Sequence, residues 1–308
     1  MIKALFIVGP TASGKTDLSI FLAKALNGEI ICADSMQIYK GIHVASAAPS
    51  ELEKDGVPHH LFEFLELDDE YSVADYVKAA RTTIKEVAKK GKLPIIVGGT
   101  GLYVSSLLDN IEYIEQDAEP VLREKLEKKF NEIGAEAMLL ELSEFDPESA
   151  ARLHPNNRRR IIHAFEVYLQ TGKSITEQNA LSRQNESEID PLVIGITYKD
   201  RELLYNRINK RVDIMLLNGL LNEAGQTIGN NKKGAFQAIG HKELYPAILG
   251  EDTVENCAEK LKQQTRRYAK RQLTWFNRDE RINWFYPDED NNYLTNALNL
   301  TKEFLKEV

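Results

Sequence analysis

Short apolar runs alternate with amphipathic stretches through the first third of the chain. Three runs are almost continuously apolar and have the length of a buried strand: residues 2–8, 29–33 and 93–97. Residues 15–27 and 73–90 carry apolar side chains at helical spacing, and the first of these helices is expected to end at Gly28. Buried strands separated by helices are typical of a parallel sheet that is covered on both faces. This part of the chain is therefore predicted to have an α/β fold.

The pattern changes at about Asn110. Residues 118–171 show helical periodicity with many charges and no strand, and the polar residues 173–190 are predicted to form a loop. Residues 192–196 are apolar again and are expected to return to the sheet, while 201–278 are predicted to be mostly helical. We therefore expect an α/β core, an inserted all-helical domain and the continuation of the core, with these bounds: 1–112, 113–190 and 191–308.

Composition excludes several classes of protein. The 308 residues are 43% hydrophobic and 28% charged, which is typical of a globular domain and unlike a disordered or fibrous chain. Two cysteines are too few for a disulfide framework, and no Cys/His cluster has zinc spacing. No apolar run approaches the roughly 20 residues of a membrane helix, and the apolar start breaks too early for a signal peptide. We expect a cytoplasmic protein with no membrane partner. The net charge of -8 argues against a general nucleic-acid binder.

A phosphate-binding motif directly follows the first predicted strand. It reads Gly9-Pro10-Thr11-Ala12-Ser13-Gly14-Lys15-Thr16 and matches G-x-x-x-x-G-K-[ST] in full. Glycines in such a loop let successive N–H groups turn inward around an anion, and the N-terminus of the following helix adds partial positive charge. Lys15 is expected to pair with phosphate oxygens, and the Thr16 hydroxyl to ligate Mg²⁺. The motif predicts a P-loop NTPase-like core with a polyphosphate site and leaves the polyphosphate open.

Polar residues also follow the second and third predicted strands. Residues 34–39 begin with Asp34, and residues 98–103 place Thr100 between glycines. Because ligands of open α/β sheets bind outside the carboxyl ends of the strands, both segments are expected to face the phosphate loop. Asp34 is the nearest candidate for a Walker B acid, and a turn cap is its alternative role. No switch-like motif follows it, which indicates that phosphate is held as a leaving group.

Basic residues gather in two segments of this acidic chain. Residues 260–278 contain no acid, and at helical spacing one face carries Arg267, Lys270, Arg271, Thr274 and Arg278, while another carries Leu261, Tyr268, Gln272 and Trp275. The second cluster is expected to open the last helix of the insertion and comprises Arg158, Arg159 and Arg160 with His154 and His163. Stripes of one charge beside aromatic residues favour contact with a nucleic-acid backbone, and a solvated surface helix is the alternative.

The adjacent histidines His59 and His60 are a weaker candidate for a site. Neighbouring residues cannot share a helix face, and no carboxylate follows at the spacing of a metal ligand. A packing role is therefore favoured over metal binding.

Six motifs in fixed order resemble those of the tRNA dimethylallyltransferase (isopentenyltransferase) family, and the match runs through nearly the whole chain. They are GPTASGKT at 9–16, DSMQIY at 34–39, GGTGLY at 98–103, HPNNRRR at 154–160, QAIGHKEL at 237–244 and RRYAKRQLTWF at 266–276. The phosphate loop alone is shared with many kinases and GTPases, whereas the ordered set is specific. The resemblance implies transfer of a dimethylallyl group from dimethylallyl diphosphate to N6 of the adenosine at position 37 of tRNA, with release of diphosphate.

The resemblance also implies roles for individual residues. Asp34 matches the aspartate proposed as general base, Thr100 matches a threonine that touches the target nucleotide, and Arg211 matches an arginine on the diphosphate. The residues that match the tRNA interface are Asp34, Ser35, Met36, Gln37, Thr100, Arg123, Arg159, Arg160, Ile161, Ile162 and His163. His163 stands where an arginine is commoner. The inserted helices resemble a mobile domain that closes over the anticodon stem-loop, and we expect a monomer.

Three alternatives remain at this point. The same chemistry on free AMP or ADP would leave the insertion and both basic segments without a role. In a small-molecule kinase, ATP would be the substrate and Asp34 would deprotonate a hydroxyl. A nucleotide-gated RNA-binding switch would lack transfer chemistry altogether.

Overall fold

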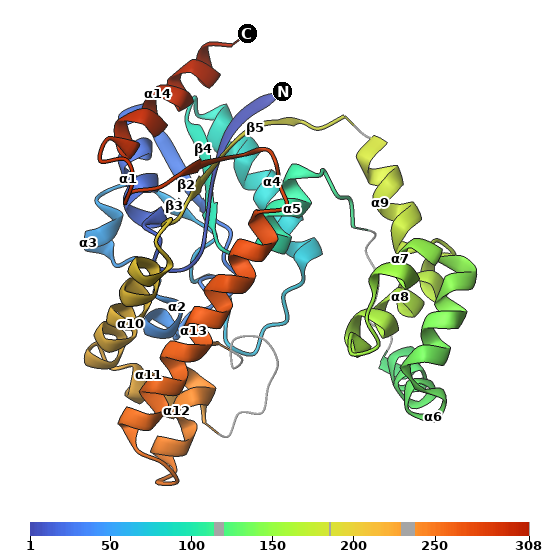
Figure 1. Ribbon diagram of the computed structural model, residues 1–308. Helices are drawn as coiled ribbons and strands as arrows, with labels where there is room; N and C mark the ends of the chain where they lie inside the picture. The colour runs from blue at the N-terminus through green and yellow to red at the C-terminus, as the bar shows by residue number, and fades with distance from the viewer. Residues whose placement is uncertain (114–119, 185, 229–237, 308) are drawn as a thin grey trace. The chain divides into compact units, whose positions relative to one another are not determined.

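The computed structural model describes residues 1–113, 120–184, 186–228 and 238–307. The chain divides into two compact units, drawn in Figure 1. Unit 1 comprises Met1–Leu108 and Glu188–Val308, and unit 2 comprises Asp109–Ser187. The insertion was predicted at 113–190, so its borders lie a few residues earlier than expected. Gln237, the first residue of the fifth motif, lies outside the described residues, as do residues 118 and 119 of the predicted helical stretch.

Six parallel strands form the sheet of unit 1 in the order β3-β2-β4-β1-β5-β6. Their bounds are β1 Ile2–Val8, β2 Gly28–Cys32, β3 His59–His60, β4 Leu93–Gly98, β5 Ile189–Ile196 and β6 Ile282–Phe285. The chain leaves β1 toward one edge of the sheet and later returns through β5 on the other side of β1. The order therefore reverses at β1, and ligands of such sheets bind at this point, outside the carboxyl ends.

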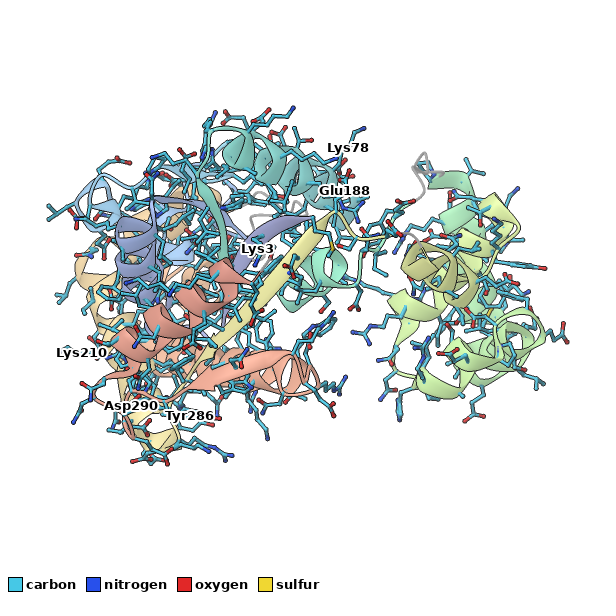
Figure 2. All side chains as sticks on the ribbon, turned by 90° about the horizontal axis from the view of Figure 1, so that it is seen from above. Lys3, Lys78, Glu188, Lys210, Tyr286 and Asp290 are labelled. Atoms are coloured by element: carbon cyan, nitrogen blue, oxygen red, sulfur yellow. The ribbon has the colours of Figure 1, made fainter. Side chains whose placement is uncertain are left out.

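Helices cover both faces of this sheet, as the apolar strands predicted. Helix α1 (Lys15–Leu26) and helix α14 (Tyr293–Lys306) pack on one face, in a core with alternate residues of β1, β4 and β5. Helix α4 (Val73–Lys89) contacts the strands from the other face, and Figure 2 shows it across the sheet from α1 and α14. Lys3 of β1, labelled there, donates to the carbonyls of Phe304 and Glu307 and so holds the end of α14.

The remaining helices of unit 1 surround the carboxyl edge of the sheet or extend from it. They are α2 His43–Ser46, α3 Glu51–Lys54, α5 Gly101–Leu108, α10 Arg201–Leu217, α11 Leu220–Thr227, α12 His241–Ile248 and α13 Val254–Phe276. Helix α1 ends at Leu26 with Asn27 as its left-handed C-cap, so Gly28 opens β2 instead of closing the helix. Strands β3 and β6 and helix α14 lie beyond the predicted elements. Both cysteines, Cys32 and Cys257, are buried and free.

Unit 2 is helical, as predicted, and has its own core. Its helices are α6 Pro120–Phe145, bent at Gly134, α7 Pro147–Arg152, α8 Arg158–Thr171 and α9 Ile175–Gln184. Leu126, Met138, Leu142 and Phe165 are among the buried residues that these helices share. The predicted loop at 173–190 was wrong, because α9 and the start of β5 occupy it. Ser174 and Glu177 cap α9 reciprocally, the S-x-x-E signal of a helix start.

Every helix in the described ranges is too short or too polar to span a membrane.

The centre of β1 provides a test of this core. Phe6 is 0% exposed, so Phe6→Ala should lower the free energy of unfolding by about 3–5 kcal/mol through lost burial and a cavity. Leu52→Ala, at a side chain that is 90% exposed, should change it by about 0.5 kcal/mol or less. Chemical denaturation measures both. Equal effects of the two substitutions would contradict the assigned burial.

Candidate active site

The phosphate loop connects β1 with α1 and has the backbone of an anion nest. Gly9, Ala12 and Gly14 have φ values of 147°, 62° and 100°, which turn successive peptide groups inward. A Cβ atom on Gly9 would lie 2.2 Å from the carbonyl oxygen of Ile196 in β5, so only glycine fits. Helix α1 starts at Lys15 without a side-chain cap on its first N–H groups. These N–H groups and the positive end of the helix dipole therefore point toward an anion bound in the loop.

Three side chains of the loop are placed to meet an anion. The Lys15 ammonium donates to the carbonyls of Gly9 (3.0 Å) and Pro10 (2.7 Å). Burial, assisted by the charge of Arg211, lowers the pKa of Lys15 to about 7, although Asp34 opposes this shift. The Ser13 hydroxyl is buried without a hydrogen-bond partner among the described residues. Thr16 is exposed on the first turn of α1.

Two side chains from distant helices hold this loop, and sequence reasoning assigned them no such role. Arg207 of α10 donates from Nε to the carbonyl of Ala12 (2.9 Å). Gln272 of α13 accepts from the N–H of Thr11 (2.9 Å) and donates to the carbonyl of Gly99 (3.0 Å). Gln272 is only 5% exposed, and a buried amide on the apolar face of an amphipathic helix was the available signal. It ties the phosphate loop to the loop that carries Thr100.

The ends of β2 and β4 meet, as the sequence predicted. The N–H of Ser35 donates to Thr100 Oγ1 (2.9 Å), and Thr100 Oγ1 donates to Ser35 Oγ (3.2 Å). Asp34 Oδ1 accepts from the N–H of Met36 (2.9 Å), so the turn-cap interpretation of Asp34 is confirmed for this oxygen. No described residue donates a hydrogen bond to Oδ2. One carboxylate oxygen is thus fixed while the other remains available for a proton.

Arg211 and Gln37 converge on the same backbone carbonyl. Arg211 donates from Nη2 to the carbonyl of Ala47 (3.3 Å), and Gln37 Nε2 donates to the carbonyls of Ser46 and Ala47 (3.2 Å each). Burial lowers the pKa of Arg211, while the charges of Asp34 and Glu53 oppose the shift. Lys15 and Arg211 are thus two cations in one poorly solvated space beside Asp34. Such a space favours a bound polyanion.

Helix α13 presents the predicted basic face to solvent. Its exposed residues include Arg267, Lys270, Arg271 and Thr274, and Arg278 is exposed just beyond its end. The Trp275 indole donates to Ser105 Oγ (2.8 Å). On the other predicted face, Leu261 and Gln272 are buried and Tyr268 is half-buried, whereas Trp275 is exposed, so the amphipathic division is confirmed in part. The contact of α13 with RNA stays a prediction.

The basic side chains of unit 2 are exposed or half-buried, and some of them are paired. Arg123 lies 3.2 Å from both carboxylate oxygens of Glu166, and His163 Nδ1 lies 3.7 Å from the same carboxylate. Arg159 and Arg160 are exposed on α8, which is followed by α9 and is therefore not the last helix. Arg158 instead donates to Asn131 (2.6 Å) and stacks on Phe130, a structural role.

Ile161 and Ile162 differ from the surface assignment that the resemblance implied. They are 0% and 1% exposed and fill the core of unit 2. Their side chains support α8 from inside, because the apolar stripe of an amphipathic helix packs inward.

The histidines of β3 have the packing role that was expected. His60 Nε2 lies 2.7 Å from a carboxylate oxygen of Glu29, and His59 Nδ1 lies 2.7 Å from the carbonyl of Val57. Within the described ranges, no group of three or more His, Cys, Asp or Glu side chains is arranged to hold a metal ion.

The site therefore combines a phosphate cradle with a carboxylate and a threonine at the neighbouring strand ends. The sequence model of the IPP transferase family matches residues 37–279 of this chain. The chain belongs to this family. The matched range contains Thr100, Arg211 and the whole of unit 2, and it begins three residues after Asp34, within the segment 34–39.

Relatives that are named tRNA dimethylallyltransferase match nearly the whole chain. A tRNA dimethylallyltransferase of Thermoanaerobacter sp. is 45% identical over 98% of this chain and 97% of its own length. The tRNA dimethylallyltransferase of Bacillus subtilis is 47% identical over 91% of this chain and 90% of its own. A solved tRNA isopentenylpyrophosphate transferase from Bacillus halodurans superposes with a TM-score of 0.73 at 40% identity, covering 98% of this chain and 96% of that chain. A eukaryotic dimethylallyltransferase described as acting on tRNA superposes with a TM-score of 0.84 at 29% identity, covering 99% and 80%.

Removing the loop ammonium tests the anion site. Lys15→Met should weaken the binding of inorganic pyrophosphate by about 10- to 100-fold, because a hydrogen bond to a charged group contributes about 1.5–3 kcal/mol. Lys24→Met, on the same helix but exposed and paired with Asp55, should leave binding unchanged. Titration calorimetry measures both. Undiminished binding by Lys15→Met would exclude the ammonium from the site.

The substitution Lys15→Met, which should weaken binding, should increase the stability of the fold at low pH. The pKa of Lys15 falls from 10.5 to about 7 on folding, so the unfolded chain binds more protons between these values and the wild type gains stability as pH rises through this window. Lys15→Met removes this term. Its free energy of unfolding should therefore exceed that of the wild type at pH of about 6, and the excess should shrink toward pH of about 10. An excess that grows with pH would contradict the lowered pKa.

Proposed function

We propose that this protein transfers a dimethylallyl group from dimethylallyl diphosphate to N6 of the adenosine at position 37 of tRNA, with release of diphosphate. The observation that carries the proposal is the position of Asp34 beside a phosphate cradle with two half-buried cations, in a member of the IPP transferase family. Similar proteins named tRNA dimethylallyltransferase support the substrate pair.

The donor diphosphate lies in the loop from Gly9 to Thr16. The inward N–H groups, Lys15 and Arg211 bind its oxygens, and the negative charge on these oxygens grows as the allylic C–O bond breaks. Fixed donors in a poorly solvated site stabilise such developing charge more strongly than water does, because they need no reorganisation during the step. The electron pair of the C–O bond leaves with the diphosphate.

The acceptor nitrogen approaches the allylic carbon from the side of Asp34. The lone pair of N6 forms the new C–N bond while the N6 proton moves to the Asp34 carboxylate, which contributes roughly 10²–10⁴ in rate as a general base. Thr100 and Ser35 bound the same space at the ends of β4 and β2, and they orient the base that is turned out of the anticodon loop. A base leaves a loop more easily than a duplex.

Mg²⁺ fits this arrangement as an ion that would be bound mainly by the diphosphate of the dimethylallyl donor. The exposed Thr16 hydroxyl follows the loop directly, and the described residues offer no cage of three acidic or sulfur ligands. Magnesium is commonly bound by few protein groups, substrate phosphate oxygens and water. We assign Thr16 and the diphosphate oxygens as its ligands, and the ion would neutralise charge on the leaving group.

The anticodon stem-loop meets two surfaces in this proposal. The basic face of α13 and the segment Ser35–Gln37 contact it in unit 1, and Arg123, Arg159, Arg160 and His163 contact its backbone in unit 2. Glu166 holds Arg123 and His163 until phosphate replaces it. We further propose that the helical insertion serves as the tRNA-contacting domain and that the chain acts as a cytoplasmic monomer.

A labelled-donor assay tests the proposed reaction directly. The protein is mixed with Mg²⁺, an anticodon stem-loop with adjacent adenosines, and either labelled dimethylallyl diphosphate or labelled ATP. Label should enter the RNA only from dimethylallyl diphosphate. Entry from ATP alone would establish a kinase, and no entry from either donor would refute the proposal.

Asp34→Asn tests the general base. The substitution keeps the size and the acceptor oxygen for Met36 but removes the basic carboxylate, so transfer should fall by roughly 10²–10⁴. Stem-loop affinity should change by no more than about threefold. Asp55→Asn, at an exposed ion pair with Lys24, is the control and should retain both properties. Single-turnover transfer near the wild-type rate would remove Asp34 from the mechanism.

A further inference from the structure

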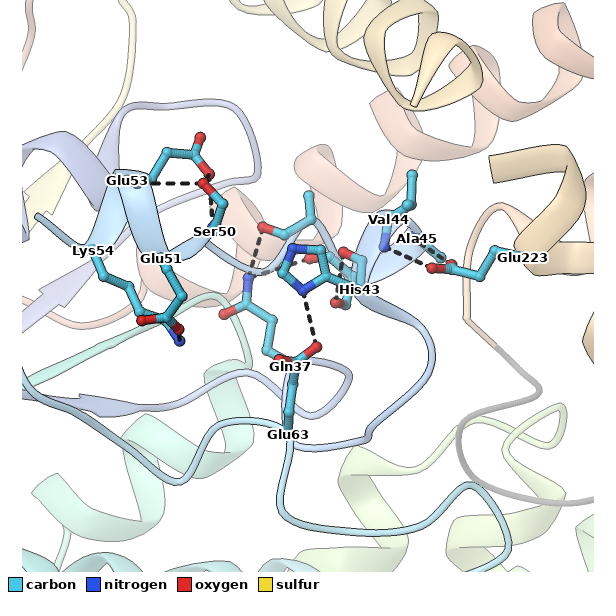
Figure 3. A network of polar contacts seen from close by, with 12 residues as sticks. Gln37, His43, Val44, Ala45, Ser50, Glu51, Glu53, Lys54, Glu63 and Glu223 are labelled. Carbon is cyan, nitrogen blue, oxygen red and sulfur yellow. Dashed lines mark hydrogen bonds and ion pairs between the residues drawn. The ribbon is translucent and has the colours of Figure 1, made fainter. Parts of the chain in front are cut away.

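The one-turn helix α2 contacts two side chains that are proposed to bind different substrates. Its last carbonyls, those of Ser46 and Ala47, both accept from the Gln37 amide, and the Ala47 carbonyl also accepts from Arg211. Figure 3 shows Gln37 against this end of the helix. Gln37 is assigned to RNA and Arg211 to the diphosphate. The position of α2 therefore affects both.

The other end of α2 is held by a carboxylate from a distant helix. Glu223 of α11 accepts from the N–H of Val44 (2.7 Å) and the N–H of Ala45 (2.9 Å), as drawn in Figure 3. The residue before the helix, Ile42, provides no side-chain cap. A helix N-terminus has unpaired N–H groups and partial positive charge, so a carboxylate there satisfies both. Glu223 supplies from elsewhere the cap that the local sequence lacks.

A buried histidine fixes this carboxylate. His241 of α12 is 0% exposed, and its Nε2 lies 2.9 Å from Glu223 Oε1. Its Nδ1 lies 3.2 Å from Thr227 Oγ1, which in turn lies 3.1 Å from the Tyr245 hydroxyl. Burial raises the pKa of Glu223, but the hydrogen bonds from His241 and from the two N–H groups outweigh it, and the pKa lies below its usual value. The cap is thus a fixed, charged carboxylate.

We propose that Glu223 and His241 are positioning residues that set Gln37 and Arg211 through α2. The proposal rests on the function proposed above, because it takes RNA and diphosphate as the ligands of these two side chains. It also gives a role to His241 in the motif at 237–244, which the reaction itself leaves without one. Neither residue touches a reacting atom. Each acts through the backbone of α2, and a displacement of about 1 Å caused by a distant residue can lower a rate by about 100-fold.

Glu223→Gln tests the proposal with little change in shape. The amide replaces one acceptor oxygen by an NH₂ group, which faces a backbone N–H instead of accepting from it. We expect kcat/KM for transfer to fall by about 10- to 100-fold and pyrophosphate binding to weaken by at least about threefold. Glu29→Gln is the matched control, because Glu29 is also a buried carboxylate paired with a histidine, His60, but lies at the amino end of β2. It should lose stability without losing activity or pyrophosphate affinity.

A double-mutant cycle separates positioning from a general loss of stability. If Glu223 acts through α2 on Gln37, then Glu223→Gln should cost much less RNA affinity in a Gln37→Ala background than in the wild type. Losses in Glu223→Gln that match those in Glu29→Gln, fully additive effects with Gln37→Ala, or activity within threefold of wild type would each overturn the proposal. Pyrophosphate binding needs no transfer reaction. A wild type that binds pyrophosphate but never modifies RNA would therefore refute the proposed function, whereas normal transfer by Glu223→Gln would refute only the positioning role.

Discussion

Two cations share a poorly solvated space beside one carboxylate, and the rest of the site depends on this arrangement. Burial lowers the pKa of both Lys15 and Arg211. The charge of Arg211 adds to the shift of Lys15, and the charge of Arg207 adds to that of Arg211. Asp34 opposes both shifts. A bound diphosphate would relieve the repulsion and restore the charge of Lys15. The two cations repel each other without a bound anion and are stabilised by a bound polyanion. Such a site is suited to bind a diphosphate leaving group.

The fold holds these charges in place through contacts from distant parts of the chain. Arg207 and Gln272 fix the phosphate loop from α10 and α13, and the Ala47 carbonyl fixes Arg211. Gly99 leaves room for the Gln272 side chain, since a Cβ on Gly99 would lie 2.1 Å from the Gln272 amide nitrogen. The helix that presents a basic face to solvent thus reaches both the phosphate loop and the Thr100 loop from its inner face. In the proposed function, this connection would link RNA contact and chemistry through one helix.

Local signals predicted what is local in this structure. The apolar strands, the phosphate loop and the amphipathic division of α13 follow from patterns within about 20 residues, and all are present. The capping box at Ser174 and Glu177 was also a local signal, but the polar character of α9 outweighed it. Strand β3 has two residues and therefore no periodicity to detect. Gln272 and Glu223 act on residues 261 and 179 positions away, which no pattern along the chain reveals.

The negative net charge coexists with a basic face on α13 and exposed arginines on α8, so charge is segregated by surface.

In the proposed reaction, the phosphate loop holds a leaving group and not a hydrolysable nucleotide. The most direct measurement is the ratio of diphosphate released to N6-dimethylallyl-adenosine formed, with both products quantified in one reaction. The account predicts a ratio of one, with no release when RNA is omitted. Release of phosphate from ATP, or diphosphate without modified adenosine, would contradict it.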